Sequence, residues 1–202
     1  VQSQPGRALT FDGVNDYVSL GSPAALQLSP GSWVISYWKR STVIVEGSAS
    51  CGSAAWIVSS ARFYYRGAWR NWAVSEPLTD AWAHIAIVYD LAATTLYRYI
   101  NGSLTDTVTG VTGAHGSGGE VRIGNYGGSF FTGKMHDWRI YNRALTATEI
   151  CNLYNATKQS GGDVAGTLYA ANLIGWWPCE EINISSIRDA SGNDRHGTQS
   201  GT

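Results

Sequence analysis

The chain has 202 residues and is nearly neutral, with 14 Lys and Arg against 15 Asp and Glu and a net charge of −1. This balance, without a basic run, argues against nucleic acid or an anionic membrane surface as the main partner, and no apolar run approaches the ~18 residues of a membrane span. Nine Trp and eleven Tyr are enough for a packed core, and 24 Gly punctuate the chain, so we expect a folded β protein and exclude disorder.

Short segments in which apolar and polar residues alternate recur along the chain, and this period is typical of β-strands. In residues 82–89 both alternating rows are fairly apolar, as expected of a strand in the middle of a two-sheet sandwich. Asn101 and Gly102 separate two such segments and predict a hairpin turn, because both residues tolerate positive φ. We predict strands at residues 8–11, 17–20, 33–40, 56–59, 62–65, 69–74, 82–89, 96–100, 103–108, 121–123, 134–141 and 173–178.

These strands predict an all-β fold, a two-sheet antiparallel β-sandwich of jelly-roll type. One short helix is predicted near residues 146–154, where Thr146 and Glu149 form a capping box and apolar residues then recur at helical spacing. Residues 157–172 are polar and Gly-rich and predict a linker, after which residues 173–202 supply one more strand and a turn-rich stretch.

Six segments in order carry a family resemblance. They are ALTFDGVNDYVSLG (8–21), SWVISYWKR (32–40), DAWAHIAIVYD (80–90), LYRYINGSL (96–104), VRIGN (121–125) and GKMHDWRIYNRALTATEICNLY (133–154). Together they resemble the laminin-G-like jelly-roll family, part of the concanavalin A-like lectin/glucanase superfamily. The resemblance implies the sandwich fold. It implies less about function, because this fold carries lectins, adhesion modules, enzyme appendages and structural domains.

The C-terminal part stands in an unusual place. LIGWWPCEE (173–181) and RDASGNDRHGTQSG (188–201) resemble the opening strand and following loop of family domains, which normally precede the FDG motif. Either the domain is circularly permuted and its tail completes its own sandwich, or the tail begins a following repeat and links subunits by strand exchange. We favour self-completion, with a jelly-roll domain at 1–156, a linker at 157–172 and a completing segment at 173–202.

A calcium site is predicted from a tight, Gly-containing loop. A hard cation such as Ca²⁺ takes about 6–8 oxygen ligands, and Asp189, Asn193 and Asp194 can turn several oxygens inward. The resemblance adds Asp137 of MHDWRIY, because similar domains often hold calcium between this loop and the acidic residue of that strand, and it makes Asp12 and Asp16 further candidates. The alternative is that the loop residues form Asx turns and bond their own backbone.

A ligand surface is predicted from residues 62–72, which hold five aromatic residues and three arginines. Aromatic faces stack on the C–H faces of sugars, and Arg and Asn donate directed hydrogen bonds to hydroxyls. Strand alternation sends half of these side chains outward, so we expect Tyr64, Arg66, and Trp69 or Trp72 to line a sheet, with Tyr126 on an adaptable Gly-rich rim. The alternative is that the aromatic residues form the core between the sheets and the arginines a solvated row.

We expect no catalytic activity. Glucanases of this superfamily carry clustered carboxylates in a Glu-x-Asp-x-(x)-Glu pattern on one strand, which this chain lacks. The four histidines are far apart in sequence, and no Gly-x-Ser-x-Gly nucleophile motif occurs.

These features predict a recognition or adhesion module at an extracellular, cell-surface or virion surface, binding a glycan or another cell-surface ligand, with a structural calcium ion. The alternative is a structural surface or virion protein, such as a phage capsid decoration, a tail-fibre module or a surface-layer unit. It would self-associate or assemble with other structural subunits through its jelly-roll domain and displaced C-terminal strand.

Overall fold

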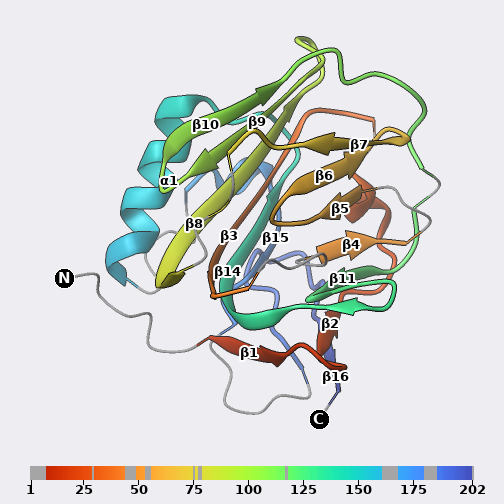
Figure 1. Cartoon of the computed structure of the whole chain (residues 1–202), viewed down its shortest axis with the longest axis vertical. Helices are drawn as coiled ribbons and strands as arrows, with labels where there is room; N and C mark the ends of the chain where they lie inside the picture. The colour runs from red at the N-terminus through yellow and green to blue at the C-terminus, as the bar shows by residue number, and fades with distance from the viewer. Residues whose placement is uncertain are drawn as a thin grey trace.

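Two antiparallel sheets pack face to face, and one helix covers the outer face of the first sheet, giving three layers (Figure 1). The computed structural model describes residues 8–28, 30–43, 49–52, 56–74, 76, 79–116, 118–160, 168–179 and 186–201. The predicted all-β, two-sheet antiparallel sandwich is confirmed.

The first sheet, sheet A, has its six main strands in the order β1-β14-β3-β8-β9-β10, and β15 also pairs with β14. Strands β1 and β15 share one edge of β14, because β1 lies beside its first four residues and β15 beside its last four. The strands are β1 (Leu9–Asp12), β3 (Trp33–Ser41), β8 (Thr79–Asp90), β9 (Thr95–Ile100), β10 (Ser103–Val108), β14 (Thr132–Tyr141) and β15 (Leu173–Trp177).

The second sheet, sheet B, is built from shorter strands in the order β16-β2-β11-β4-β5-β6-β7. A small hairpin of β12 (Asn125–Tyr126) and β13 (Ser129–Phe130) follows β11. The strands of sheet B are β2 (Tyr17–Ser19), β4 (Ala49–Cys51), β5 (Trp56–Val58), β6 (Arg62–Tyr65), β7 (Ala68–Asn71), β11 (Val121–Ile123) and β16 (Thr198–Ser200).

Aromatic side chains hold the two sheets together. The Trp33 ring of sheet A lies 5.5 Å from the Phe63 ring and 5.1 Å from the Tyr65 ring of sheet B, centroid to centroid. The predicted hairpin at Asn101 and Gly102 also forms, and both residues have positive φ. Strand β8 is buried on both faces, with Ile85, Ile87 and Tyr89 toward sheet B and Ala86 and Val88 toward the helix, which explains its two apolar rows.

Helix α1 (Ala147–Ser160) is longer than predicted. Its capping box forms as expected, because the Glu149 amide donates to Thr146 Oγ1 at 3.3 Å and the Thr146 amide donates to the Glu149 carboxylate at 2.8 Å. The predicted end near 154 and the linker start at 157 are wrong. Thr157 is buried and accepts a hydrogen bond from Trp38 Nε1 at 2.9 Å, so the helix stays docked on sheet A.

The remainder of the predicted linker includes residues 161–167, which lie outside the described residues. After them, a 3-10 helix, η3 (Ala170–Asn172), leads directly into β15. A second 3-10 helix, η1 (Ala24–Gln27), lies between β2 and β3.

The C-terminal segment, here called the clasp (residues 173–179 and 186–201), contacts the edges of both sheets of its own chain. Strand β15 pairs with β14 of sheet A, and β16 pairs with β2 of sheet B. Trp177, the last residue of β15, is fully buried in the main core, and its Nε1 donates to the Arg195 carbonyl at 2.8 Å. A side chain at Gly175 would collide with the Trp177 ring, so glycine makes room for this anchor.

Candidate functional site

One cross-strand row runs over the outer face of sheet B. Directly paired residues of neighbouring strands lie on the same face of a sheet, and successive residues alternate between faces. Val18, Ile123 and Val58 belong to the buried core, so the residues next to them in the sequence point to the outer face of the sheet. The outer row consists of Thr198, Ser19, Arg122, Ser50, Ile57, Tyr64 and Trp69, one from each strand of the sheet.

The β12–β13 hairpin carries Tyr126 and is held by Asn125. The Asn125 side chain is 1% exposed, and its amide donates to the carbonyls of Gly127 and Ser129, both at 3.2 Å. Its backbone carbonyl accepts a hydrogen bond from Ser50 Oγ at 2.8 Å, which ties the hairpin to β4. Gly124 precedes the hairpin with φ +87°, and a Cβ there would collide with the Phe11 ring. These contacts fix the place of Tyr126.

Three partly exposed aromatic residues form what we call the aromatic strip: Tyr64, Trp69 and Tyr126. The ring centroids of Tyr64 and Trp69 are 5.4 Å apart, and those of Trp69 and Tyr126 are 6.1 Å apart, both edge to face. The Arg62 guanidinium lies 4.1 Å from the Trp69 ring centroid, a cation–π geometry that fixes the indole. These contacts join side chains of β6, β7 and the hairpin into one surface.

Next to the strip is a small concavity of about 180 Å³, the polar pocket, lined by Ser50, Glu120, Arg122, Asn125 and Tyr126 among others. Arg122 donates to the Glu120 carboxylate at 2.8 and 2.6 Å and to the Asn125 side-chain oxygen at 3.2 Å. A hydrogen bond from Ser19 and the Arg122 guanidinium lower the pKa of Glu120, which is therefore a carboxylate at neutral pH. The pocket thus presents charged donors and acceptors in a connected network.

The structure brings together three of the five residues predicted to bind a ligand, Tyr64, Trp69 and Tyr126. The expectation that Trp72 could point outward is wrong, because its side chain is 8% exposed, belongs to the core and lies under the Arg98 guanidinium. Arg66 lies apart from the strip. Its guanidinium contacts the rings of Tyr65 and Tyr89 and donates to the Gly113 carbonyl at 2.9 Å.

Sequence patterns did not single out the polar pocket. Glu120, Arg122 and Asn125 lie within and beside a three-residue strand that follows a Gly-rich stretch, and they gain their partners only when β11 pairs with β2 and β4. Alternation in Val121–Ile123 places Arg122 on the face of the strand that points away from the core, because the residues on either side of it are buried. This alternation was the signal from which Arg122 could have been found.

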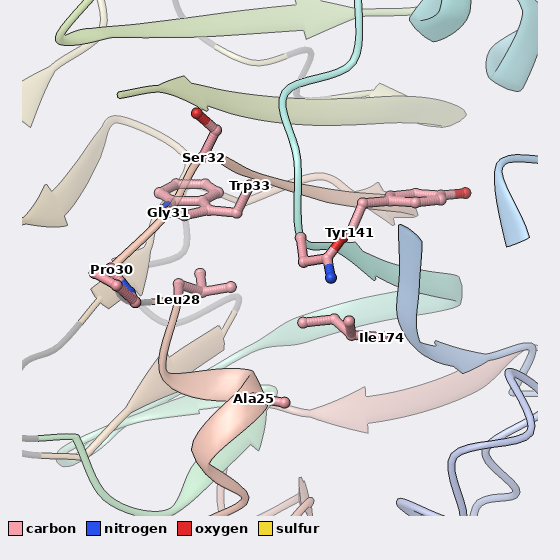
Figure 2. A pocket seen from close by; sticks show the side chains of 9 residues that line it. Ala25, Leu28, Pro30, Gly31, Ser32, Trp33, Tyr141 and Ile174 are labelled. Atoms are coloured by element: carbon pink, nitrogen blue, oxygen red, sulfur yellow. The ribbon is translucent and has the colours of Figure 1, made fainter. Parts of the chain in front are cut away.

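A second pocket, of about 310 Å³, lies at one end of the sandwich between η1, β3, β14 and β15. Figure 2 shows Leu28 and Ile174 reaching into it from opposite sides while the Tyr141 ring points away. Its walls are largely apolar, and two of its polar groups are engaged within the protein. Ser32 Oγ accepts the Leu91 amide hydrogen at 3.0 Å, and the Asn142 side-chain oxygen accepts from Asn172 at 3.2 Å. This pocket offers few groups that could recognise a polar ligand.

The acidic residues proposed for calcium hold protein donors. Asp189 accepts backbone hydrogen bonds from Trp176, Ser191 and Arg195 at 2.9–3.0 Å, so it forms the Asx turn given as the alternative. Burial acts to raise its pKa, but these hydrogen bonds prevail and the pKa is lowered. Asp137 is fully buried and pairs with Arg139 at 2.8 Å.

The other candidates do not converge on these two. Asn193 donates to the Leu173 carbonyl at 3.1 Å, and Asp194 is exposed. Asp12 pairs with Thr132, five residues along β14 from Asp137 and so roughly 16 Å away. Asp12 accepts the Val14 amide hydrogen and Asp16 accepts that of Asp12. Within the described ranges no group of three His, Cys, Asp or Glu side chains that could hold a metal ion occurs, and calcium binding stays a prediction.

Residues 12–151 match the family model described as the concanavalin A-like lectin/glucanases superfamily, a laminin-G type. The chain belongs to this family. No curated protein matches the sequence significantly. In the part of the chain that the structure describes, no helix has the length and apolar character needed to cross a membrane.

Solved structures share the fold at low sequence identity. A protein of Bacteroides ovatus, described as a candidate carbohydrate-binding protein, has a TM-score of 0.66 and 19% identity, covering 98% of this chain and 60% of its own. This chain therefore spans less than two thirds of that protein. The heptameric pentraxin of Limulus polyphemus has a TM-score of 0.53 and 16% identity over 76% of this chain and 78% of its own.

A third similar structure is domain 4 of an extracellular arabinanase from Geobacillus stearothermophilus, solved in complex with arabinotriose. Its TM-score is 0.53 and its identity 17%, covering 75% of this chain and 78% of its own. Likenesses at these identities establish the fold that these proteins have in common with this chain.

Proposed function

We propose that this domain is a non-catalytic carbohydrate-binding module that acts outside the cell and binds its glycan on the outer face of sheet B. The observation that carries the proposal is the junction of the aromatic strip with the polar pocket through Tyr126, which lines the pocket and contacts Trp69. Sugars have apolar C–H faces and polar hydroxyl edges, so a surface that offers rings beside fixed hydrogen-bonding groups complements both.

The comparisons support this proposal at the level of the fold. The Bacteroides protein is described as a candidate carbohydrate-binding protein, and the Geobacillus domain was solved with a trisaccharide. A related structure concerns botulinum neurotoxin type C, whose cell entry depends on two ganglioside molecules (TM-score 0.53, 13% identity over 77% of this chain and 46% of its own).

The chemistry of the polar pocket also favours binding over hydrolysis. Glycosidases generally place two carboxyl groups on either side of the scissile bond. Among the described residues that line this pocket, Glu120 is the carboxylate, and it is engaged by Arg122 and Ser19. A paired carboxylate with a lowered pKa is a poor general acid at neutral pH.

A glycan array that includes arabinotriose tests the proposal. We expect the wild-type domain to bind at least one glycan, and Trp69→Ala to weaken binding of the longest bound glycan about tenfold, because the aromatic–sugar stack is lost with the ring. The matched control is Leu104→Ala, since Leu104 is 51% exposed on β10 of sheet A, away from the proposed face. Failure to bind any glycan, or equal binding by Trp69→Ala and wild type, would contradict the proposal.

A further inference from the structure

We infer that the ligand is an oligosaccharide chain that lies across two subsites, the polar pocket and the aromatic strip, and that a single terminal sugar does not fill the site. This inference rests on the proposed function and names the class of glycan it requires.

The two subsites are far apart on the sheet. Arg122 of the pocket lies on β11 and Trp69 of the strip lies on β7, with β4, β5 and β6 between them. Neighbouring strands are about 4.8 Å apart, so the two strands are separated by roughly 19 Å. The Arg122 guanidinium lies 4.6 Å from the centroid of the Tyr17 ring of β2, on the side of β11 away from β7, so the two side chains do not converge on one sugar ring.

The surface between them is continuous. Tyr126 lines the polar pocket and its ring also lies 6.1 Å from the Trp69 ring, so it belongs to both subsites. Asn125 holds this bridge in place through its hydrogen bonds to the hairpin and to Arg122. A chain that leaves the pocket along Tyr126 arrives at Trp69 and Tyr64.

The two subsites also differ in chemistry. The pocket, at about 180 Å³, is smaller than the ~300–1,000 Å³ of pockets that enclose drug-sized ligands, so it accommodates about one ring. Glu120 and Arg122 neutralise each other there, so the ring it holds carries no charge of its own. The strip offers aromatic rings, on which further rings of the chain stack.

The test is chain-length dependence, measured by isothermal titration calorimetry. The probes are neutral arabino-, xylo-, cello- and manno-oligosaccharides of one to six rings. We expect the affinity for the preferred series to rise at least tenfold from one ring to four rings. In Trp69→Ala this gain falls to threefold or less while binding of the shortest bound member is unchanged. The double variant Glu120→Gln/Arg122→Met weakens all lengths by a similar factor, about tenfold.

Leu104→Ala is the control, and thermal melting establishes that each variant is folded. If Trp69→Ala is not folded, Tyr64→Ala with the same titrations takes its place, because Tyr64 is partly exposed and belongs to the same strip. It should also reduce the length dependence. Equal affinity for one and four rings would overturn the two-subsite inference and leave the proposed function standing. Absence of binding to every neutral series and to the glycan array would overturn both.

Discussion

The indole Nε1 of Trp176 donates a 2.7 Å hydrogen bond to the carboxylate of Asp137, while the backbone amide of Trp176 donates to Asp189 at 3.0 Å. One residue of the clasp thus binds two of the five acids proposed as calcium ligands. Asp137 also pairs with Arg139, whose guanidinium lies 4.5 Å from the Trp176 ring centroid. Burial raises the pKa of Asp137, and Arg139 and Trp176 oppose that shift.

Asp137→Ala combined with Asp189→Ala tests the calcium prediction. The hydrogen bonds within the protein predict a large loss of stability, about 3–5 kcal/mol for Asp137 alone, because the buried Arg139 guanidinium then lacks the carboxylate that balances its charge. Melting temperatures measured in calcium and in chelator separate this effect from metal binding. If calcium raises the melting temperature of the wild type but not that of the variant, a bound ion is supported. If the variant's melting temperature is lower by the same amount in calcium and in chelator, the calcium prediction is contradicted.

Trp69→Ala should affect glycan binding and Trp72→Ala should affect stability, although the two residues are only three positions apart. Trp72 fills the core, so its removal is expected to lower the free energy of unfolding by about 3–5 kcal/mol. Trp69 is partly exposed and stacked on Arg62, so its removal should lower stability far less and reduce glycan binding instead. Urea unfolding checks the first effect and calorimetric titration the second. If Trp69→Ala instead caused the large loss of stability and Trp72→Ala the loss of binding, Trp69 would point into the core and Trp72 to the outer face.

Stability should fall as the solution becomes acidic. Burial, with the charge of Arg139 as a smaller cause, lowers the pKa of both His84 and His136 to about 3. Both are neutral in the folded protein, whereas the unfolded chain takes up protons below its ordinary pKa of about 6.5. The free energy of unfolding is therefore not reduced by these histidines above pH 6.5. Between pH 6.5 and pH 3 it falls by about 1.4 kcal/mol per histidine and pH unit.

His136→Phe isolates one of these groups. The His136 ring stacks on Trp38 and lies edge to face with Trp82, and neither ring nitrogen has a hydrogen-bond partner within the described residues, so phenylalanine fits the same contacts. Urea unfolding between pH 4.5 and 7.5 should show a shallower loss for this variant. An unchanged slope would place the acid sensitivity elsewhere.

The clasp should contribute strongly to stability. Trp177→Ala removes a fully buried ring from the main core and is expected to cost about 3–5 kcal/mol. Gly175→Ala, which adds only a methyl group against that ring, should also destabilise by about 1–3 kcal/mol through overpacking. Thermal unfolding measures both, with Thr198→Ala on the exposed side of β16 as control. A wild-type melting temperature for Trp177→Ala would show that the clasp is not part of the cooperative unit.

Long strands with clear alternation were predictable from the sequence, as β3, β8, β9 and β14 show. Strands β4 and β16 and the β12–β13 hairpin, with two or three residues each, were not predicted, and they form where a partner strand lies beside them. The prediction ended helix α1 too early. Thr157 is polar, and the hydrogen bond to Trp38 that docks it on sheet A depends on a residue far away in the sequence. Tyr64 and Trp69 followed from alternation, whereas Trp72 lies just after β7, where alternation no longer applies.

The position of the clasp has a consequence for how the chain folds. Thr198 pairs with Ser19, 179 positions earlier, so the contact that closes the edge of sheet B is among the most non-local in the molecule. Contacts of this kind form slowly, because the entropy of closing a long loop is lost before the pairing stabilises it. During synthesis the edge of β2 on this side therefore stays open until residues 198–200 have left the ribosome. Over that interval the nascent domain is exposed to pairing with other chains.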